Sequence, residues 1–177
     1  MKRIPLTQGQ FAIVDDADFE WLSKWKWCAR WNPNTRSYYA VRTIRVPNGK
    51  HTNIWMHRLI LGLERGDKRK GDHINHDTLD QRRVNLRIVT NQENAFNQRG
   101  PRGYSWNRNT KKFSMQIKVD GKKKFLGYFH DPVTARASYL AAKKHLHVIH
   151  PQAPPIQDKE SNDESRIPQA AWHRAAV

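Results

Sequence analysis

Hydrophobic and polar residues alternate over several short stretches of the chain, a pattern typical of strands that bury one face. Alternating stretches at 38–46 and 51–56 flank a Pro-Asn-Gly turn at 47–49, which predicts a hairpin. Before the hairpin, residues 15–25 begin with acidic side chains and then carry apolar residues at helical spacing, so we expect a helix there. The sequence therefore predicts a small β-rich domain over residues 1–63.

Four tryptophans lie close together in residues 21–31, namely Trp21, Trp25, Trp27 and Trp31. They could stack on nucleic-acid bases, but aromatic stripes more often form the core of a small domain, and we expect a core here. The apolar run at 56–63 fits either a short buried helix or a strand. We expect His57, within this run, to be structural rather than catalytic.

The segment 69–99 combines signals for a strand, a loop, a second strand and a helix. Residues 85–90 alternate as a strand does. Thr90, with Glu93 three residues later, forms a capping-box pattern, which predicts a helix over 91–98 that ends before a Gly-Pro pair.

Three polar residues of this segment have the chemistry of a hydrolytic metal site. Asn94 lies one turn into the predicted helix and can point back toward the strand of Asp72 and His73. A carboxylate and an amide oxygen suit Mg²⁺ or Mn²⁺, with water and a substrate phosphate completing the shell. The imidazole of His73 could take a proton from water. The spacing alone also fits a capped loop with a surface histidine.

Charge is distributed unevenly along the chain. The 177 residues carry 32 Lys and Arg against 16 Asp and Glu, a net charge of +16 with a pI near 10.3. Residues 101–150 hold eleven basic and two acidic side chains, whereas 64–100 hold eight and six. Such an excess of basic residues indicates a polyanionic partner. Its placement favours catalysis in residues 64–100 and nucleic-acid binding by residues 101–150.

Residues 100–146 predict a three-stranded antiparallel sheet packed on one helix. Residues 113–119 alternate in polarity, and Asp120-Gly121 is a two-residue hairpin turn. Asp131 and Pro132 begin the helix, whose apolar stripe should pack on the apolar sheet face. That expected stripe consists of Val133, Ala137, Leu140 and Ala141. The other face then presents Ser114, Gln116, Lys118, Lys123 and Phe125.

This polar face suits the major groove of DNA, with lysines on phosphates and Gln116 or Arg108 on base edges. The alternative is a basic solvated sheet without a ligand.

The run DHINHDTLDQRRVNLRIVTNQEN, which begins at Asp72, resembles the HNH, or ββα-metal, nuclease motif of phage and intron-encoded homing endonucleases. The D-H pair, the N-L-R triplet and the T-x-x-x-N spacing carry the resemblance, and the N-terminal stretches VDDADFEWLSKWKW and MHRLIL are similar as well. The resemblance implies that His73 is the general base and that Asp72 and Asn94 are the metal ligands. It also implies that Asn85 braces the loop carrying the base.

The chain departs from this family pattern at two positions of the loop. His76 stands where the family usually has Gly, so it either accepts a positive φ at a cost of about 1 kcal/mol or adopts another conformation. Gln81 replaces a common Asn. Both departures concern loop geometry rather than the ligands.

The downstream motifs G-Y-x-W, K-F-x-x-x-I, L-G-Y-F and A-R-A-S-Y-L-A-A resemble the APETALA2-type DNA-binding domain. That resemblance implies contacts to the major groove from a three-stranded sheet. Its contact positions fall on Gln116, Lys118, Lys123 and Phe125 and, with a spacing that differs by about one residue, on Trp106 and Arg108.

The expected fold is α+β, with four segments: 1–63, 64–100, 101–150 and a polar, Pro-rich, disordered tail at 151–177. Cys28 is the single cysteine, so we expect neither an internal disulfide nor a structural zinc site built on cysteines. A reducing, cytoplasmic location in a bacterial or phage-infected cell is expected. The sequence contains no signal-peptide pattern and no apolar run of about 18 residues, so we expect no membrane association.

The expected function is that of a metal-dependent homing endonuclease, which hydrolyses phosphodiester bonds of double-stranded DNA with Mg²⁺ or Mn²⁺. One alternative is a DNA-binding regulator whose nuclease site is silent. Another is the same chemistry in phage DNA packaging or restriction. A monomer with one active site should nick, and a symmetric double cut would need a dimer.

Overall fold

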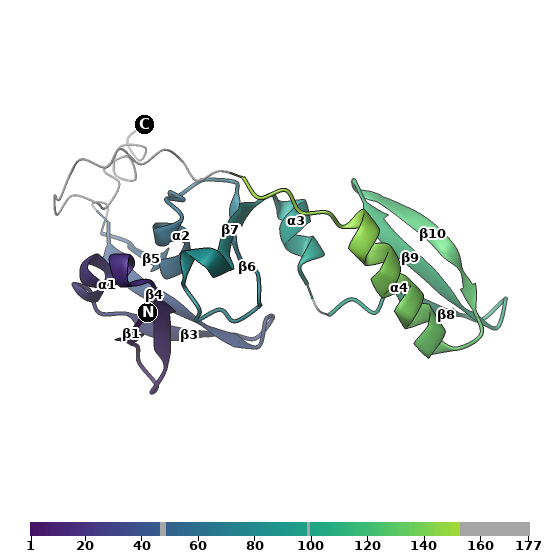
Figure 1. Ribbon diagram of the computed structural model, residues 1–177, viewed down its shortest axis with the longest axis horizontal. Coiled ribbons are helices and arrows are strands. Elements are labelled where there is room, and N and C mark those ends of the chain that lie inside the picture. The colour runs from purple at the N-terminus through teal and green to yellow at the C-terminus, as the bar shows by residue number, and fades with distance from the viewer. Residues whose placement is uncertain (47–48, 99, 153–177) are drawn as a thin grey trace. The chain divides into compact units, whose positions relative to one another are not determined.

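The chain forms two compact units in a computed structural model (Figure 1), which describes residues 1–46, 49–98 and 100–152. The first unit consists of Met1–Val89 with the segment that begins at Pro151, and the second consists of Thr90–His150. Both combine small antiparallel sheets with few helices, which confirms the predicted α+β class. The expected turn residues Pro47 and Asn48 and the tail from 153 onward lie outside the described residues.

The elements of the first unit follow one another closely along the chain. They are β1 (Lys2–Pro5), β2 (Phe11–Val14), α1 (Asp16–Ser23), β3 (Cys28–Asn32), β4 (Ser37–Arg45), β5 (His51–Trp55), α2 (Met56–Ile60), β6 (Lys70–His73), the 3-10 helix η1 (Arg83–Asn85) and β7 (Leu86–Val89). β1 pairs with β2, β4 lies between β3 and β5, and β6 pairs with β7, all antiparallel.

A single hydrophobic cluster joins these elements. Leu22 of α1, Ala40 of β4 and Ile60 of α2 lie in one buried cluster with Leu86 and Ile88 of β7. The strand pair β6–β7 therefore shares its core with the N-terminal sheet. The apolar run at 56–63 begins with the helix α2, so the helix rather than the strand is the correct one of the two predicted alternatives.

The tryptophan cluster is largely a core, as expected. Trp27 is buried, and Trp21 and Trp25 pack against the same cluster, with edge-to-face ring contacts along the series. The prediction is wrong for Trp31, which is half exposed and contacts the ring of Tyr38.

The second unit contains α3 (Asn91–Phe96), β8 (Tyr104–Asn107), β9 (Lys112–Val119), β10 (Lys122–Phe129) and α4 (Pro132–Leu146). The predicted capping box is present: the Thr90 hydroxyl accepts from the Glu93 amide, and the Glu93 carboxylate accepts from the Thr90 amide. Strand β9 lies between β8 and β10, and its pairing with β10 has the predicted register, Lys118 opposite Lys123 and Gln116 opposite Phe125.

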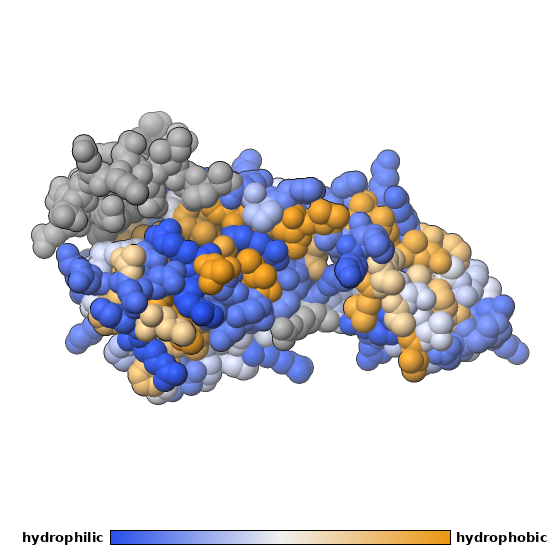
Figure 2. All heavy atoms as spheres, in the orientation of Figure 1, coloured by the Kyte–Doolittle hydropathy of each residue, from blue (hydrophilic) through white to orange (hydrophobic). Residues whose placement is uncertain are grey.

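The face of α4 that packs on the sheet differs from the predicted one. Ala135 and Tyr139 are buried, and Tyr139 packs with Met115 and Ile117 of β9. Val133, by contrast, is 76% exposed. The predicted stripe fails because Tyr139 offers far more apolar area than an alanine, so its side of the helix turns inward. Apolar patches are visible on the helix side of this unit in Figure 2.

Among the described residues, no helix has both the length and the apolar character needed to cross a membrane.

Candidate functional site

Asp72 and His73 lie at the end of β6, where both side chains are buried. β6 is antiparallel to β7 and places Asp72 opposite Arg87 and His73 opposite Leu86. Successive residues of a strand point to opposite faces, so the carboxylate and the imidazole leave β6 on different sides. The strand pair thus fixes both groups through backbone pairing.

Arg87 is the charge partner of Asp72. Its guanidinium donates through Nε at 2.8 Å and through an Nη at 2.7 Å, both to Oδ2 of Asp72. Both side chains are largely buried, and the two contacts orient the carboxylate. Any cation at Asp72 therefore binds a carboxylate that is already neutralised in part.

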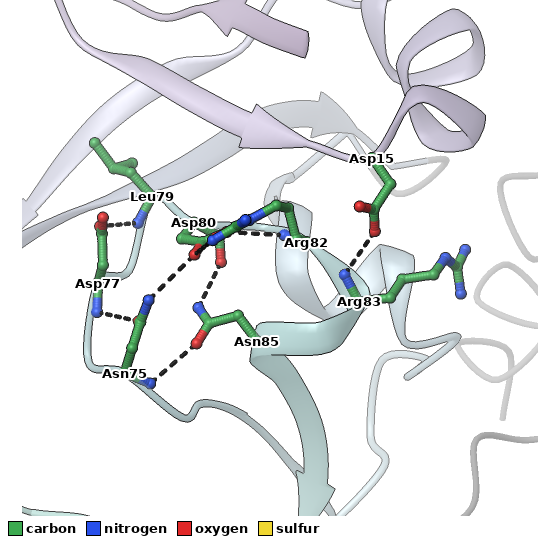
Figure 3. A network of polar contacts seen from close by, with 8 residues as sticks. All are labelled: Asp15, Asn75, Asp77, Leu79, Asp80, Arg82, Arg83 and Asn85. Carbon is green, nitrogen blue, oxygen red and sulfur yellow. Dashed lines mark hydrogen bonds and ion pairs between the residues drawn. The ribbon is translucent and has the colours of Figure 1, made fainter. Parts of the chain in front are cut away.

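Asn85 ties together the loop that follows His73 (Figure 3). Its side-chain oxygen accepts from the Asn75 backbone amide at 3.0 Å, and its amide group donates to the Asp80 carbonyl at 2.8 Å. The Ile74 amide donates to the Asn85 carbonyl at 2.9 Å. Buried Asn85 thus contacts both ends of the loop, which suits the bracing role that the HNH resemblance implies.

The two departures from the family pattern are accommodated in this loop. His76 adopts the left-handed region with φ 68°, and its amide donates to the His73 carbonyl at 3.1 Å. The turn therefore keeps the shape that glycine favours, with the steric cost that a side chain brings. Gln81 is fully buried and donates to the Thr78 carbonyl at 2.7 Å.

The N-terminal elements anchor the far end of the loop. The Arg83 guanidinium donates twice to the buried Asp18 carboxylate of α1, at 2.8 Å each. Figure 3 shows the Arg83 amide, which donates to the Asp15 carboxylate. The Gln81 amide donates to the Ile13 carbonyl of β2 at 2.8 Å. Helix α1 and strand β2 thus position residues 81–83, which precede Asn85.

Replacing Asn85 with Ala should loosen this loop. The change removes two hydrogen bonds from a buried group, which costs about 1–3 kcal/mol of unfolding free energy. We also expect slower DNA cleavage, because the loop begins directly at His73. Thermal unfolding and a plasmid-nicking assay measure the two effects. Asn109→Ala, in an exposed turn, should change neither, and equal behaviour of the two variants would contradict the bracing role.

Aromatic and imidazole rings surround His73. The ring of His57 lies 5.0 Å from it, and the ring of Tyr39 lies 6.2 Å away, measured between centroids. Gly71 makes room for His57, since a Cβ at this position would come 2.6 Å from the histidine Cδ2. Trp55 completes the group through its ring contacts with Tyr39 and His57.

Burial lowers the pKa of His73 below the ordinary imidazole value, although the nearby Asp72 charge acts in the opposite direction. Burial also lowers the pKa of His57 to well below that value, and the proximity of His73 adds to the shift. Both imidazoles are therefore neutral near pH 7, and neutrality is what a general base at position 73 requires.

Asn94 lies on α3, in the second unit. The Asp72 carboxylate is a hard donor of the kind that a divalent cation such as Mg²⁺ prefers, and a metal site shared by Asp72 and Asn94 stays a prediction. Within residues 1–46, 49–98 and 100–152, no three His, Cys, Asp or Glu side chains gather closely enough to hold a metal ion.

Four of the predicted DNA-contacting residues share one face of the second unit. Gln116, Lys118, Lys123 and Phe125 are exposed, and cross-strand pairing places them on the face opposite Met115 and Ile117. Ser114, expected on this face, is buried.

Trp106 lies on the other side of the sheet. It pairs with Phe113 of β9, and the two rings are 4.9 Å apart. Arg108 is exposed in the turn between β8 and β9. The sheet therefore does not bring Trp106 to the face of Gln116 and Lys118.

Sequence reasoning missed three residues of these sites. Arg87 could have been placed opposite Asp72 from the alternation of the two strands. Tyr128 joins Phe125 on the face of Gln116, Lys118 and Lys123, called the open face below, because the register shifts between Phe125 and Gly127. A glycine within a strand, here Gly127, is a signal for such a bulge. The contact of His57 with His73 joins residues distant in sequence and had no such signal.

The middle of the chain is similar to a known protein family. Residues 54–96, which run from β5 through α3, match the HNH endonuclease family model. Neither the curated proteins nor the solved structures yield a match. The matched stretch contains Asp72, His73, Asn85 and Asn94. This match, together with the placement of the first three residues, supports an HNH nuclease that acts on nucleic acid.

Proposed function

We propose that the protein is a metal-dependent DNA endonuclease of the homing type. The observation that carries the proposal is the match of residues 54–96 to the HNH endonuclease family model. Within this stretch His73 follows Asp72 on β6, and Asn85 braces the loop that comes after His73. HNH nucleases typically use a divalent metal ion. The substrate is double-stranded DNA, consistent with a net charge of +16.

His73 serves as the general base in this proposal. Its neutral imidazole accepts a proton from the water that attacks the scissile phosphorus, and the leaving group is the 3′-oxygen of the neighbouring nucleotide. Asp72 and Asn94 would hold the metal ion, Mg²⁺ or Mn²⁺, which as a Lewis acid stabilises negative charge on the phosphate when bound. Asn85 maintains the loop, and Arg87 orients the Asp72 carboxylate.

The open face of the second unit is proposed to hold the DNA. Lys118 and Lys123 are cross-strand partners, with Gln116 and Phe125 as the adjacent pair. The sheet with its single helix α4 agrees with the architecture that the APETALA2 resemblance implies. We propose that lysines contact phosphates, that Gln116 and Arg108 reach base edges, and that Phe125 makes apolar contacts.

Replacing both Lys118 and Lys123 with Ala should weaken binding and reduce its salt dependence. Each lost phosphate contact lowers the slope of log K against log salt by about one, so the double variant should lose about two. Fluorescence anisotropy with a labelled duplex at several salt concentrations measures this. Lys144→Ala, exposed on α4, should leave the slope unchanged. An unaltered slope in the double variant would exclude this face from the interface.

A DNA-binding regulator with a silent nuclease site is the second candidate. The observation that favours it is the ion pair of Arg87 with Asp72, in which both guanidinium contacts engage Oδ2 of the carboxylate. Nicking of supercoiled plasmid with and without Mg²⁺ distinguishes the regulator from the nuclease.

Mapping the cut ends on flanking phage or host DNA would separate homing from packaging or restriction. A monomer in the cytoplasm that nicks one strand is the form we propose, with a dimer needed for a symmetric double cut.

A further inference from the structure

The sheet β3–β4–β5 has one face whose centre lies in the core, and a second face that is exposed at Arg30 and Arg45 but buried at Val41. Ala29 pairs with Ala40 and Arg42 pairs with Ile54, and these residues form the inner face, where both alanines are buried. The other face carries the alternate residues of the three strands and is called the outer face below. It includes Arg30, Tyr39, Thr43, Arg45, Asn53 and Trp55.

The outer face is basic and lacks acidic groups. Residues 21–63, which contain the whole sheet, carry eight Lys and Arg and no Asp or Glu. Arg30 and Arg45 are exposed on this face, and the Arg30 guanidinium lies 5.9 Å from the centre of the Trp55 ring. Thr43 and Asn53 are exposed beside them and hydrogen-bond to each other at 3.0 Å. A face of this composition is complementary to a phosphate backbone.

One end of the outer face reaches the candidate general base. Tyr39 lies 6.2 Å from His73 and 5.5 Å from Trp55 between ring centroids, and Tyr39 and Trp55 are both partly exposed. Arg45 lies six residues from Tyr39 along β4, a distance of about 20 Å at the rise of a strand. The same length of DNA strand contains about six nucleotides.

We propose that this outer face binds the DNA duplex beside the phosphodiester that is cut, with Arg30 and Arg45 on phosphates and Tyr39 nearest the cut. The placement of the outer face beside the cut rests on the proposed nuclease function, whereas its binding to DNA does not depend on that function. It gives the N-terminal sheet a ligand that is separate from the open face of the second unit.

The single cysteine of the chain lies on this face and serves as a probe. Cys28 is exposed and pairs with Val41, which also pairs with Trp55. In a His73→Ala background, duplex DNA should protect Cys28 from alkylation by iodoacetamide. The matched control is Cys28→Ser with Glu20→Cys, which moves the thiol to an exposed position on α1 and should remain reactive. Equal alkylation of Cys28 with and without DNA would overturn the proposal.

Arginine variants test the charge contribution. Arg30→Ala and Arg45→Ala should each lower the salt slope of duplex binding by about one. Arg3→Ala, exposed on β1, removes the same charge elsewhere and should leave the slope unchanged. A slope that falls equally in all three would assign the effect to net charge and would contradict a specific surface.

A chelated iron attached to Cys28 reports where the outer face lies on the DNA relative to the nick. Hydroxyl radicals should cut the duplex within about one helical turn of the nick that the wild-type enzyme makes. Radical cuts far from the nick, or spread evenly, would overturn the placement. Protection of Cys28 without any nicking would refute the nuclease function and leave the surface intact. Nicking without protection would refute the surface alone.

Discussion

His73→Ala should abolish nicking of supercoiled DNA while duplex binding persists. A general base contributes about 10²–10⁴-fold to a rate, and position 73 offers the imidazole beside Asp72. Burial holds the pKa of His73 below its ordinary value, so the base is in its neutral form at the pH of the assay. Single-turnover nicking with saturating enzyme measures the loss, and anisotropy with the same duplex measures binding.

Because His73 is buried, its removal also leaves a cavity, and a folding defect must be separated from a chemical one. His73→Gln fills more of the space without restoring an imidazole, so it should be nearly as inactive but more stable. His145→Ala, exposed on α4, should nick as the wild type does. A His73→Gln variant that is folded and fully active would refute the assignment of the base.

Gly103→Ala should strongly destabilise the second unit. Gly103 has φ 80°, and a Cβ there would clash with the ring of Tyr139, the buried centre of this unit. Strain in the left-handed region and overpacking together cost about 2–5 kcal/mol. For a unit of this size the melting temperature should fall by at least about 8 °C, with loss of DNA affinity.

Gly121→Ala is the matched control. Gly121 has φ 75°, close to the value at Gly103, but no atom lies within 4 Å of the point where an alanine Cβ would stand. It should cost only the backbone strain, about 1–2 kcal/mol. Differential scanning calorimetry of both variants compares the two costs. Equal melting temperatures would mean that the Tyr139 ring moves aside freely and that the packing argument is wrong.

Local signals in the sequence predicted local structure well. The Asp120-Gly121 turn fixed the β9–β10 register from the turn outward, because a two-residue loop allows little choice of pairing. Thr90 and Glu93 predicted the start of α3 for the same reason, since a capping box involves only neighbours in sequence.

Packing and contacts that depend on the rest of the fold could not be predicted from the sequence. Helix α4 carries two apolar stripes, and only the sheet determines that Tyr139, rather than Leu140, packs inward. For the candidate site, Asp72 and His73 were identified from their chemistry, and Asn85 through the HNH resemblance. Arg87 and His57, which surround them, became visible once strand pairing and helix packing were known.

The anchor between Arg83 and Asp18 limits how the nuclease can be dissected. The family match begins at residue 54, yet the carboxylates that hold Arg83 come from Asp15 and Asp18, and the carbonyl that holds Gln81 comes from Ile13. An expression fragment trimmed to residues 54–96 would lose all three. A fragment that retains an ordered loop behind His73 must therefore include β2 and α1.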